Sequence, residues 1–184
     1  RKPLRRPFCS QLSAGDEDAG KLDPFLIYKD SLEEAGELAL NIICEIYGYN
    51  SRDDEYEAVK EAVKAAKQHE TPCMSVLADA LMNFPESDEY HLIGRKLGRK
   101  IKNLKEVGMA KLLFGTGKEK GLGFDNLLNI IQIQNIQMPS PETPKADYTQ
   151  EELISTVLML PIGAFAKTFA MSDRSIFKVV LFDE

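Results

Sequence analysis

The sequence closes with two adjacent carboxylates, Asp183 and Glu184, at the end of the apolar octet FKVVLFDE. An apolar stretch of this kind predicts a buried strand, and a parallel strand delivers the residues at its carboxyl end to the edge of the sheet where ligands bind. There, one carboxylate can hold the hydration shell of a Mg²⁺ ion while its neighbour polarises the water that attacks a phosphate. The candidate site is therefore Asp183, which would bind the metal and the nucleotide cofactor, and Glu184, the candidate catalytic residue.

The same octet has a plainer interpretation, namely a strand that ends in two solvated acids. Short apolar runs followed by Asp-Glu are common by chance, so the octet alone does not decide between the two interpretations. Adjacent residues of a strand point to opposite sides, so the two acids cannot share one role. In the catalytic interpretation Asp183 faces the metal and Glu184 faces the attacking water.

Composition and charge are those of an ordinary globular protein. The 184 residues are 43% hydrophobic and 28% charged, with a net charge of −6. This charge excludes a strong overall positive field that would recruit nucleic acid, although it does not exclude a local basic patch. The cysteines Cys9, Cys44 and Cys73 lack the spacing of a zinc site or a disulfide framework, which favours a reducing cytoplasm.

Hydrophobic periodicity predicts four helices in series between residues 30 and 107. The first begins with a capping box formed by Ser31 and Glu34, and the third begins at Thr71-Pro72, an N-cap followed by a proline. Each helix has one apolar face, so together they predict a compact helical unit.

The region after Gly108 predicts a strand, a helix and a second strand. NIIQIQN at 129–135 is β-branched and partly alternating, and the second strand covers 175–183. The helix between them begins with a capping box at Thr149 and contains Pro161, which should bend or split it. Its apolar stretch is interrupted and falls short of the about 18 residues of a membrane span, so we expect a buried helix. A strand–helix–strand unit predicts parallel strands and an α/β fold.

A basic stretch, RKLGRKIKNLK at 95–105, has two interpretations. It could contact DNA, but its six basic residues interleave with apolar residues at helical spacing. A solvated helix face is therefore the favoured interpretation.

Four stretches together resemble the large ATPase of conjugative type IV secretion systems, the TraC/TrsE-like family, which is similar to RecA-like and HerA/FtsK motor ATPases. They are GKLDPF, LFG before a glycine-rich turn, NIIQIQNIQMPSPET, and the run from LISTVL to LFDE. The resemblance covers 14–184 and is most specific over the last 60 residues. It implies a partial RecA-like parallel sheet (βαβ) with a mostly helical insertion. The expected parts are an irregular lead-in over 1–29, the helical insertion over 30–107 and a core segment over 108–184.

The resemblance also limits which residues can be assigned a catalytic role. On the family's pattern only Asp183 and Glu184, its Walker B pair, fall on catalytic positions. The phosphate-binding loop GxxxxGK[ST] is absent, and the nearest stretch, GTGKEKG at 115–121, places Glu119 where a hydroxyl should reach Mg²⁺. We therefore expect the middle of an ATPase domain that is inactive on its own.

For the complete parent, the resemblance implies ATP and Mg²⁺ as cofactors and ATP hydrolysis that powers conjugative DNA transfer. It implies a homo-oligomer in the cytoplasm at the inner face of the cell membrane. Its expected partners are other proteins of the conjugation and secretion machinery, with DNA as a further candidate. The alternative function is a non-catalytic helical module that docks to other components of a secretion complex.

Overall fold

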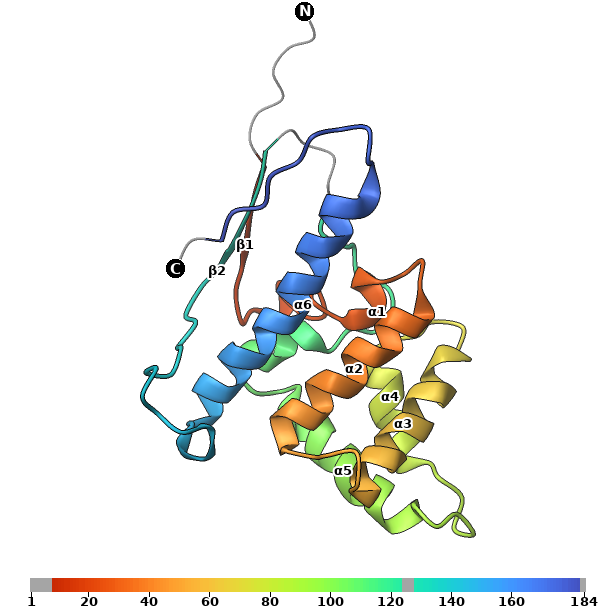
Figure 1. The fold of residues 1–184 in the computed structure, drawn as a ribbon. Helices are drawn as coiled ribbons and strands as arrows, with labels where there is room; N and C mark the ends of the chain where they lie inside the picture. Colours follow the sequence, from red (N-terminus) through yellow and green to blue (C-terminus); the bar gives the residue numbers. More distant parts are fainter. Residues whose placement is uncertain (1–7, 124–127, 183–184) are drawn as a thin grey trace, which may run out of the picture.

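The computed structural model describes residues 8–123 and 128–182, in which a group of helices lies beside a small parallel sheet (Figure 1). The predicted α/β fold class is confirmed, and the arrangement is consistent with part of a RecA-like fold. The elements are, in order, β1 (Phe8–Leu12), η1 (Asp16–Asp18), α1 (Pro24–Ile27), α2 (Leu32–Tyr47), α3 (Asp54–Lys67), α4 (Met74–Met82), α5 (His91–Leu104), η2 (Gly108–Leu113), β2 (Asn129–Ile133), η3 (Lys145–Asp147) and α6 (Gln150–Ser172).

The four helices predicted between 30 and 107 are present as α2 to α5, but the third begins at Met74 after the N-cap Cys73, so the predicted cap at Thr71-Pro72 is wrong. Only half of the capping box predicted at Ser31 forms: its hydroxyl accepts a hydrogen bond from the Glu34 N–H, but the Ser31 N–H donates to the Tyr28 carbonyl oxygen and the Glu34 carboxylate pairs with Lys167. Helix α2 ends at Gly48 in the left-handed conformation. The core between these helices is closely filled, with many side chains fully buried. Its largest members include Ile42, Ile43, Met74, Leu77, Leu81, Leu97 and Ile101.

Strand β2 pairs with a different strand from the one that the sequence predicts. The strand expected at 129–135 forms as β2, but it pairs in parallel with β1, from Phe8 opposite Asn129 to Leu12 opposite Ile133. A strand therefore lies within the lead-in over 1–29 that was expected to be irregular. Its five residues are too few for a periodic signal, and its partner lies far away in the sequence.

The second predicted strand, over 175–183, is not formed in its described part, because residues 175–182 belong to neither a helix nor a strand. Phe177 and Leu181 are 91% and 86% exposed. An apolar strand of a parallel sheet needs neighbours on both faces, and two strands alone do not supply them. The predicted βαβ pairing is therefore wrong for this chain by itself.

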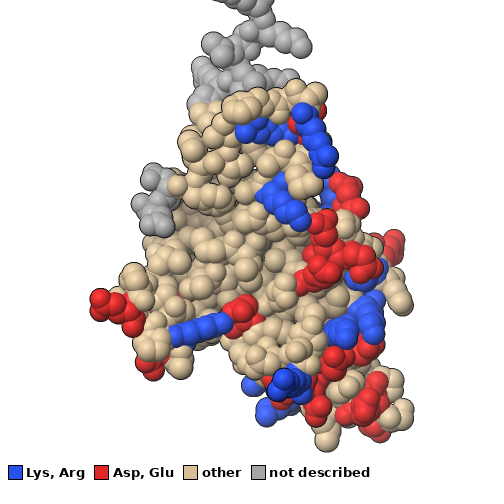
Figure 2. All heavy atoms as spheres, in the orientation of Figure 1, with Lys and Arg blue, Asp and Glu red and all other residues tan. Residues whose placement is uncertain are grey.

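Helix α6 is a single helix, so of the two outcomes predicted for Pro161, a bend or a split, the split does not occur. Pro161 is buried, and proline removes only one hydrogen bond of the helix. The capping box predicted at its start is present: the Glu152 N–H donates to the Thr149 hydroxyl, and the Thr149 N–H donates to the Glu152 carboxylate. Among the described residues, α6 is long and apolar enough to cross a membrane by length and composition, so the prediction that its apolar stretch falls short of a membrane span is wrong. Here it packs on α1, α2 and η2, and the surface over it carries few charges (Figure 2).

Candidate functional site

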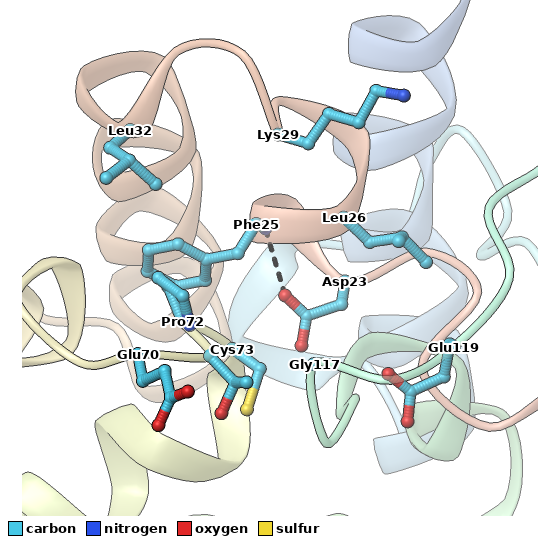
Figure 3. Close-up of a pocket in the computed structure, with 11 residues that line it drawn as sticks. Asp23, Phe25, Leu26, Lys29, Leu32, Glu70, Pro72, Cys73, Gly117 and Glu119 are labelled. Atoms are coloured by element: carbon cyan, nitrogen blue, oxygen red, sulfur yellow. Dashed lines mark hydrogen bonds between the residues drawn. The ribbon is translucent and has the colours of Figure 1, made fainter.

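Asp23 is a buried carboxylate that joins three segments of the chain (Figure 3). It is the N-cap of α1, and its Oδ1 atom accepts a hydrogen bond of 2.9 Å from the Phe25 N–H. Its Oδ2 atom accepts hydrogen bonds of 2.8 Å from the N–H groups of Met74, at the start of α4, and of Gly115. We call Asp23 and these three N–H groups the Asp23 junction. It connects GKLDPF to the glycine-rich turn, two of the stretches on which the family resemblance depends.

The junction brings the backbones of two glycines into contact. A Cβ atom on Gly20, which has a φ of +73°, would lie 2.4 Å from the Cα atom of Gly115. The Gly20 N–H donates to the Lys111 carbonyl oxygen, and the Leu22 N–H donates to that of Leu112. A side chain at Gly20 would push these two backbone segments apart, and one at Gly115 would meet the carboxylates of Glu119 and Asp23, so both glycines serve the packing.

Burial raises the pKa of Asp23 to about 7, against an ordinary value of 3.8, and the nearby Glu119 carboxylate adds to the increase. The three N–H donors act in the opposite direction, because they stabilise the ionised form. A perturbed carboxyl beside a cavity is a candidate for chemistry. Here, however, both oxygen atoms are already engaged by backbone donors, which is typical of a structural role.

A cavity of about 210 Å³ adjoins the junction, and its walls include Lys29, Thr71, Cys73 and Glu119 (Figure 3). Burial raises the pKa of the Cys73 thiol, which disfavours the reactive thiolate. The cavity therefore offers neither an activated nucleophile nor a free acid pair.

In the turn GTGKEKG at 115–121, the Glu119 side chain accepts hydrogen bonds from groups of the turn itself. The Glu119 carboxylate accepts hydrogen bonds from the N–H and the hydroxyl of Thr116, each at 2.7 Å, and from the Lys118 N–H at 3.1 Å. A phosphate-binding loop needs such N–H groups free for its ligand. The geometry therefore agrees with a plain turn rather than a phosphate cradle.

A second cavity, of about 200 Å³, lies at the carboxyl edge of the sheet. Ala14 follows β1, Asn135 and Gln137 follow β2, and Ser155 comes from α6. Asn135 has a φ of +59°, and the Gln137 N–H donates to the buried Ser155 hydroxyl at 3.0 Å. Ligands of open parallel sheets bind at this edge, so we take this carboxyl-edge cavity as the candidate functional site. Sequence reasoning missed it, although the amides Asn135 and Gln137, at the end of the predicted strand and just after it, were a usable signal.

The two site residues predicted from the sequence, Asp183 and Glu184, lie outside the described residues, so their role stays a prediction. Within residues 8–123 and 128–182, no group of three or more His, Cys, Asp or Glu side chains is placed to hold a metal ion. The described residues alone thus provide carbonyl, amide and hydroxyl groups at the sheet edge but no metal centre.

Comparison with known proteins gives one family and one distant relative. The model of a family described as an AAA-like domain matches residues 9–184. The uncharacterized protein YddE of Bacillus subtilis (strain 168) is 22% identical over 158 residues, which are 84% of this chain and 18% of that protein. The chain thus spans less than a fifth of the relative's length. No solved structure matches.

Proposed function

Since the chain belongs to the AAA-like domain family, which is found in TraC/TrsE-type ATPases, we propose that it is a segment of the ATPase domain of a conjugative type IV secretion motor. The observation that carries the proposal is the family match over 9–184, almost the whole chain. In the complete parent, ATP and Mg²⁺ would bind at the carboxyl edge of the sheet. Asp183 would hold the metal, and Glu184 would polarise the attacking water.

The exposed segment 176–182 supports this assignment. Six of its seven residues are large apolar side chains with exposures between 39% and 91%: Ile176, Phe177, Val179, Val180, Leu181 and Phe182. An exposed run of this kind in a soluble protein indicates a surface that another part of the protein covers. In the parent we propose that it becomes a further strand of the sheet, which would bring Asp183 and Glu184 to the edge at which β1 and β2 end.

One polar residue within this segment ties it to α6. The Lys178 ammonium donates to the Phe169 carbonyl oxygen at 3.0 Å and to the Ser172 hydroxyl at 2.8 Å. The segment therefore leaves the end of α6 in a defined direction rather than at random.

The finer parts of the proposal concern the parent protein. We propose that it is a homo-oligomer in the cytoplasm at the inner face of the cell membrane, where it acts with other conjugation and secretion proteins. The 184 residues alone should not hydrolyse ATP, because the sequence lacks GxxxxGK[ST] and Glu119 occupies the nearest set of N–H groups. The alternative, a non-catalytic helical docking module, predicts that the parent also does not hydrolyse ATP.

The test is the Glu184→Gln change in the parent protein. Glutamine keeps the size of the side chain and removes the charge that polarises water. We expect ATP affinity to be retained and turnover to fall about a hundredfold or more, the scale of a positioned acid–base group. Glu142→Gln, at an exposed loop position, is the control and should leave turnover unchanged. Turnover at the wild-type rate in Glu184→Gln would show that the catalytic assignment is wrong.

A further inference from the structure

Helix α5 carries a dense group of positive charges. Arg95, Lys96, Arg99 and Lys100 are all exposed, and we call these four residues the α5 basic face. The sequence has no Asp or Glu from residue 90 to residue 105, although the whole chain has a net charge of −6. The α5 basic face is thus a local reversal of the overall charge.

The opposite side of α5 is fixed against its neighbours, which determines where the charges point. A Cβ atom at Gly98 would lie 2.9 Å from the Ala78 carbonyl oxygen, and one at Gly94 would lie 2.6 Å from the Leu81 carbonyl oxygen. Helix α5 therefore lies very close to α4, and the contact does not permit it to rotate. The α5 basic face is held on a rigid element and directed to solvent.

Most of these charges have no acidic partner. Some basic residues outside this face are paired with acids: Lys60 with Glu57 on α3, Lys111 with Asp16, and Lys102 of α5 itself with Asp79. Among the described residues, by contrast, Arg95, Lys96 and Arg99 form no ion pair.

The fourth residue of the face, Lys100, has an aromatic partner instead of an acid. Its ammonium lies over the Tyr47 ring, 5.6 Å from the ring centroid. A cation–π contact of this kind leaves the positive charge of the lysine in place. The α5 basic face is therefore not neutralised within the described structure.

The shape of this surface selects among anionic partners. A helix that lies on a membrane needs a free apolar face, but that of α5 is buried against α3 and α4, and Leu92 is its one large apolar side chain that is mostly exposed. Side chains at i and i+4 lie about 6 Å apart, so Arg95–Arg99 and Lys96–Lys100 form two short rows of charge. Rows of charge suit a polymer with regularly repeated anions, and guanidinium groups bind phosphate through two hydrogen bonds.

We propose that the α5 basic face binds the phosphate backbone of a nucleic acid without regard to base sequence. The interaction needs no nucleotide and no residue of the carboxyl edge, so it is independent of the ATPase assignment. Because the rest of the chain is acidic overall, we expect contact to be confined to this face and to weaken steeply with salt.

The experiment measures binding of the 184-residue chain to fluorescent oligonucleotides of mixed sequence, single-stranded and duplex, by anisotropy over a range of salt concentrations. The test variant is Arg95→Gln with Arg99→Gln. The control variant is Lys60→Gln with Lys64→Gln on α3, which removes the same charge at the same spacing from a half-buried and an exposed position, both of them paired with acids. Circular dichroism checks that each variant is folded.

We expect the wild type and the control to bind alike, and the test variant to bind at least about tenfold more weakly at low salt. Loss of two phosphate contacts should also lower the slope of log affinity against log salt by about 1.4 to 1.8. The single-stranded and duplex arms show which form is preferred, and preference for either one supports the proposal.

Four results would overturn the proposal. The first is the absence of binding at the lowest salt concentration, and the second is an equal loss of binding in both variants. The third is competition by polyglutamate that equals competition by unlabelled oligonucleotide, which would indicate an acidic protein partner. The fourth is sedimentation with phosphatidylserine vesicles that depends on Arg95 and Arg99 when oligonucleotide binding does not, which would indicate a membrane.

Discussion

The helical part of the molecule, α2 to α5, and the part around the sheet, β1, β2 and the segment after α6, differ in how completely they are covered. Ile101 in α5 is fully buried, whereas Ile130 in β2 is 44% exposed and Phe177 is 91% exposed. A helix forms its backbone hydrogen bonds within itself, but each strand of a sheet needs neighbours that other segments supply. A segment of a larger domain can therefore contain a complete helical unit and an incomplete sheet.

The largest effect should come from emptying the helical core. Ile101→Ala removes a fully buried side chain and leaves a cavity, so we expect the free energy of unfolding to fall by about 3 kcal/mol. The matched change in the sheet, Ile131→Ala, affects a half-buried residue and should cost about 1 kcal/mol. Urea unfolding monitored by circular dichroism gives both values. Equal costs would remove the contrast between the two parts.

The Asp23 junction joins α4 of the helical part to α1 and to the turn after η2, and Asp23→Asn tests it. Asparagine keeps the size but offers one acceptor oxygen in place of two, so at least one buried N–H loses its partner, at a cost of about 1–3 kcal/mol. The change should also alter the pH dependence of stability. Because the pKa of Asp23 rises from 3.8 when unfolded to about 7 when folded, the folded state holds the extra proton between these values. The contribution of this proton to the stability of the folded state is complete below about pH 4 and is lost as the pH rises to 7.

The measurement is the free energy of unfolding of wild type and Asp23→Asn at several pH values between 4 and 7.5. The advantage of the wild type should shrink as the pH rises. An advantage that grows with pH would mean that the three N–H donors outweigh burial and lower the pKa of Asp23 instead.

The smallest effect is expected for the exposed segment. Leu181 is 86% exposed, so Leu181→Ser should change the free energy of unfolding of the 184-residue chain by less than about 0.5 kcal/mol. In the parent, where we propose that the segment is a covered strand, the same change should cost about 3 kcal/mol. Thermal unfolding of both proteins gives the comparison, and an equally small effect in the parent would contradict the proposed strand.

The features that the sequence predicts correctly depend on neighbouring residues. The capping residues Ser31 and Thr149 were recognisable because a cap and its helix are adjacent in the chain. The dipeptide Asp23-Pro24 carries the same kind of local signal, with proline at the first helical position, but α1 was not predicted from it, because residues 1–29 were expected to be irregular.

The features that escaped prediction depend on distant contacts. No local pattern shows that Asp23 also accepts hydrogen bonds from Met74 and Gly115, which lie 51 and 92 positions away. The pairing of β1 with β2 has the same cause, because FCSQL is too short to be read as a strand without its partner. The segment over 175–183 carries a strong strand pattern, but residues 175–182 pair with no strand in the described part of the chain.

The separation of Asp23 from its last donor has a consequence during protein synthesis. Gly115 follows Asp23 by 92 residues, and ribosomes add about 5–20 residues per second, so the junction waits on the order of 5–20 s for its final hydrogen bond. Helices α2 to α5 are all translated within that interval, and they pack mainly against one another, although α2 also contacts α1 and α6. The nascent chain therefore completes its helical unit first, and during that time Asp23 stays ionised in water until the glycine-rich turn leaves the ribosome and closes over it.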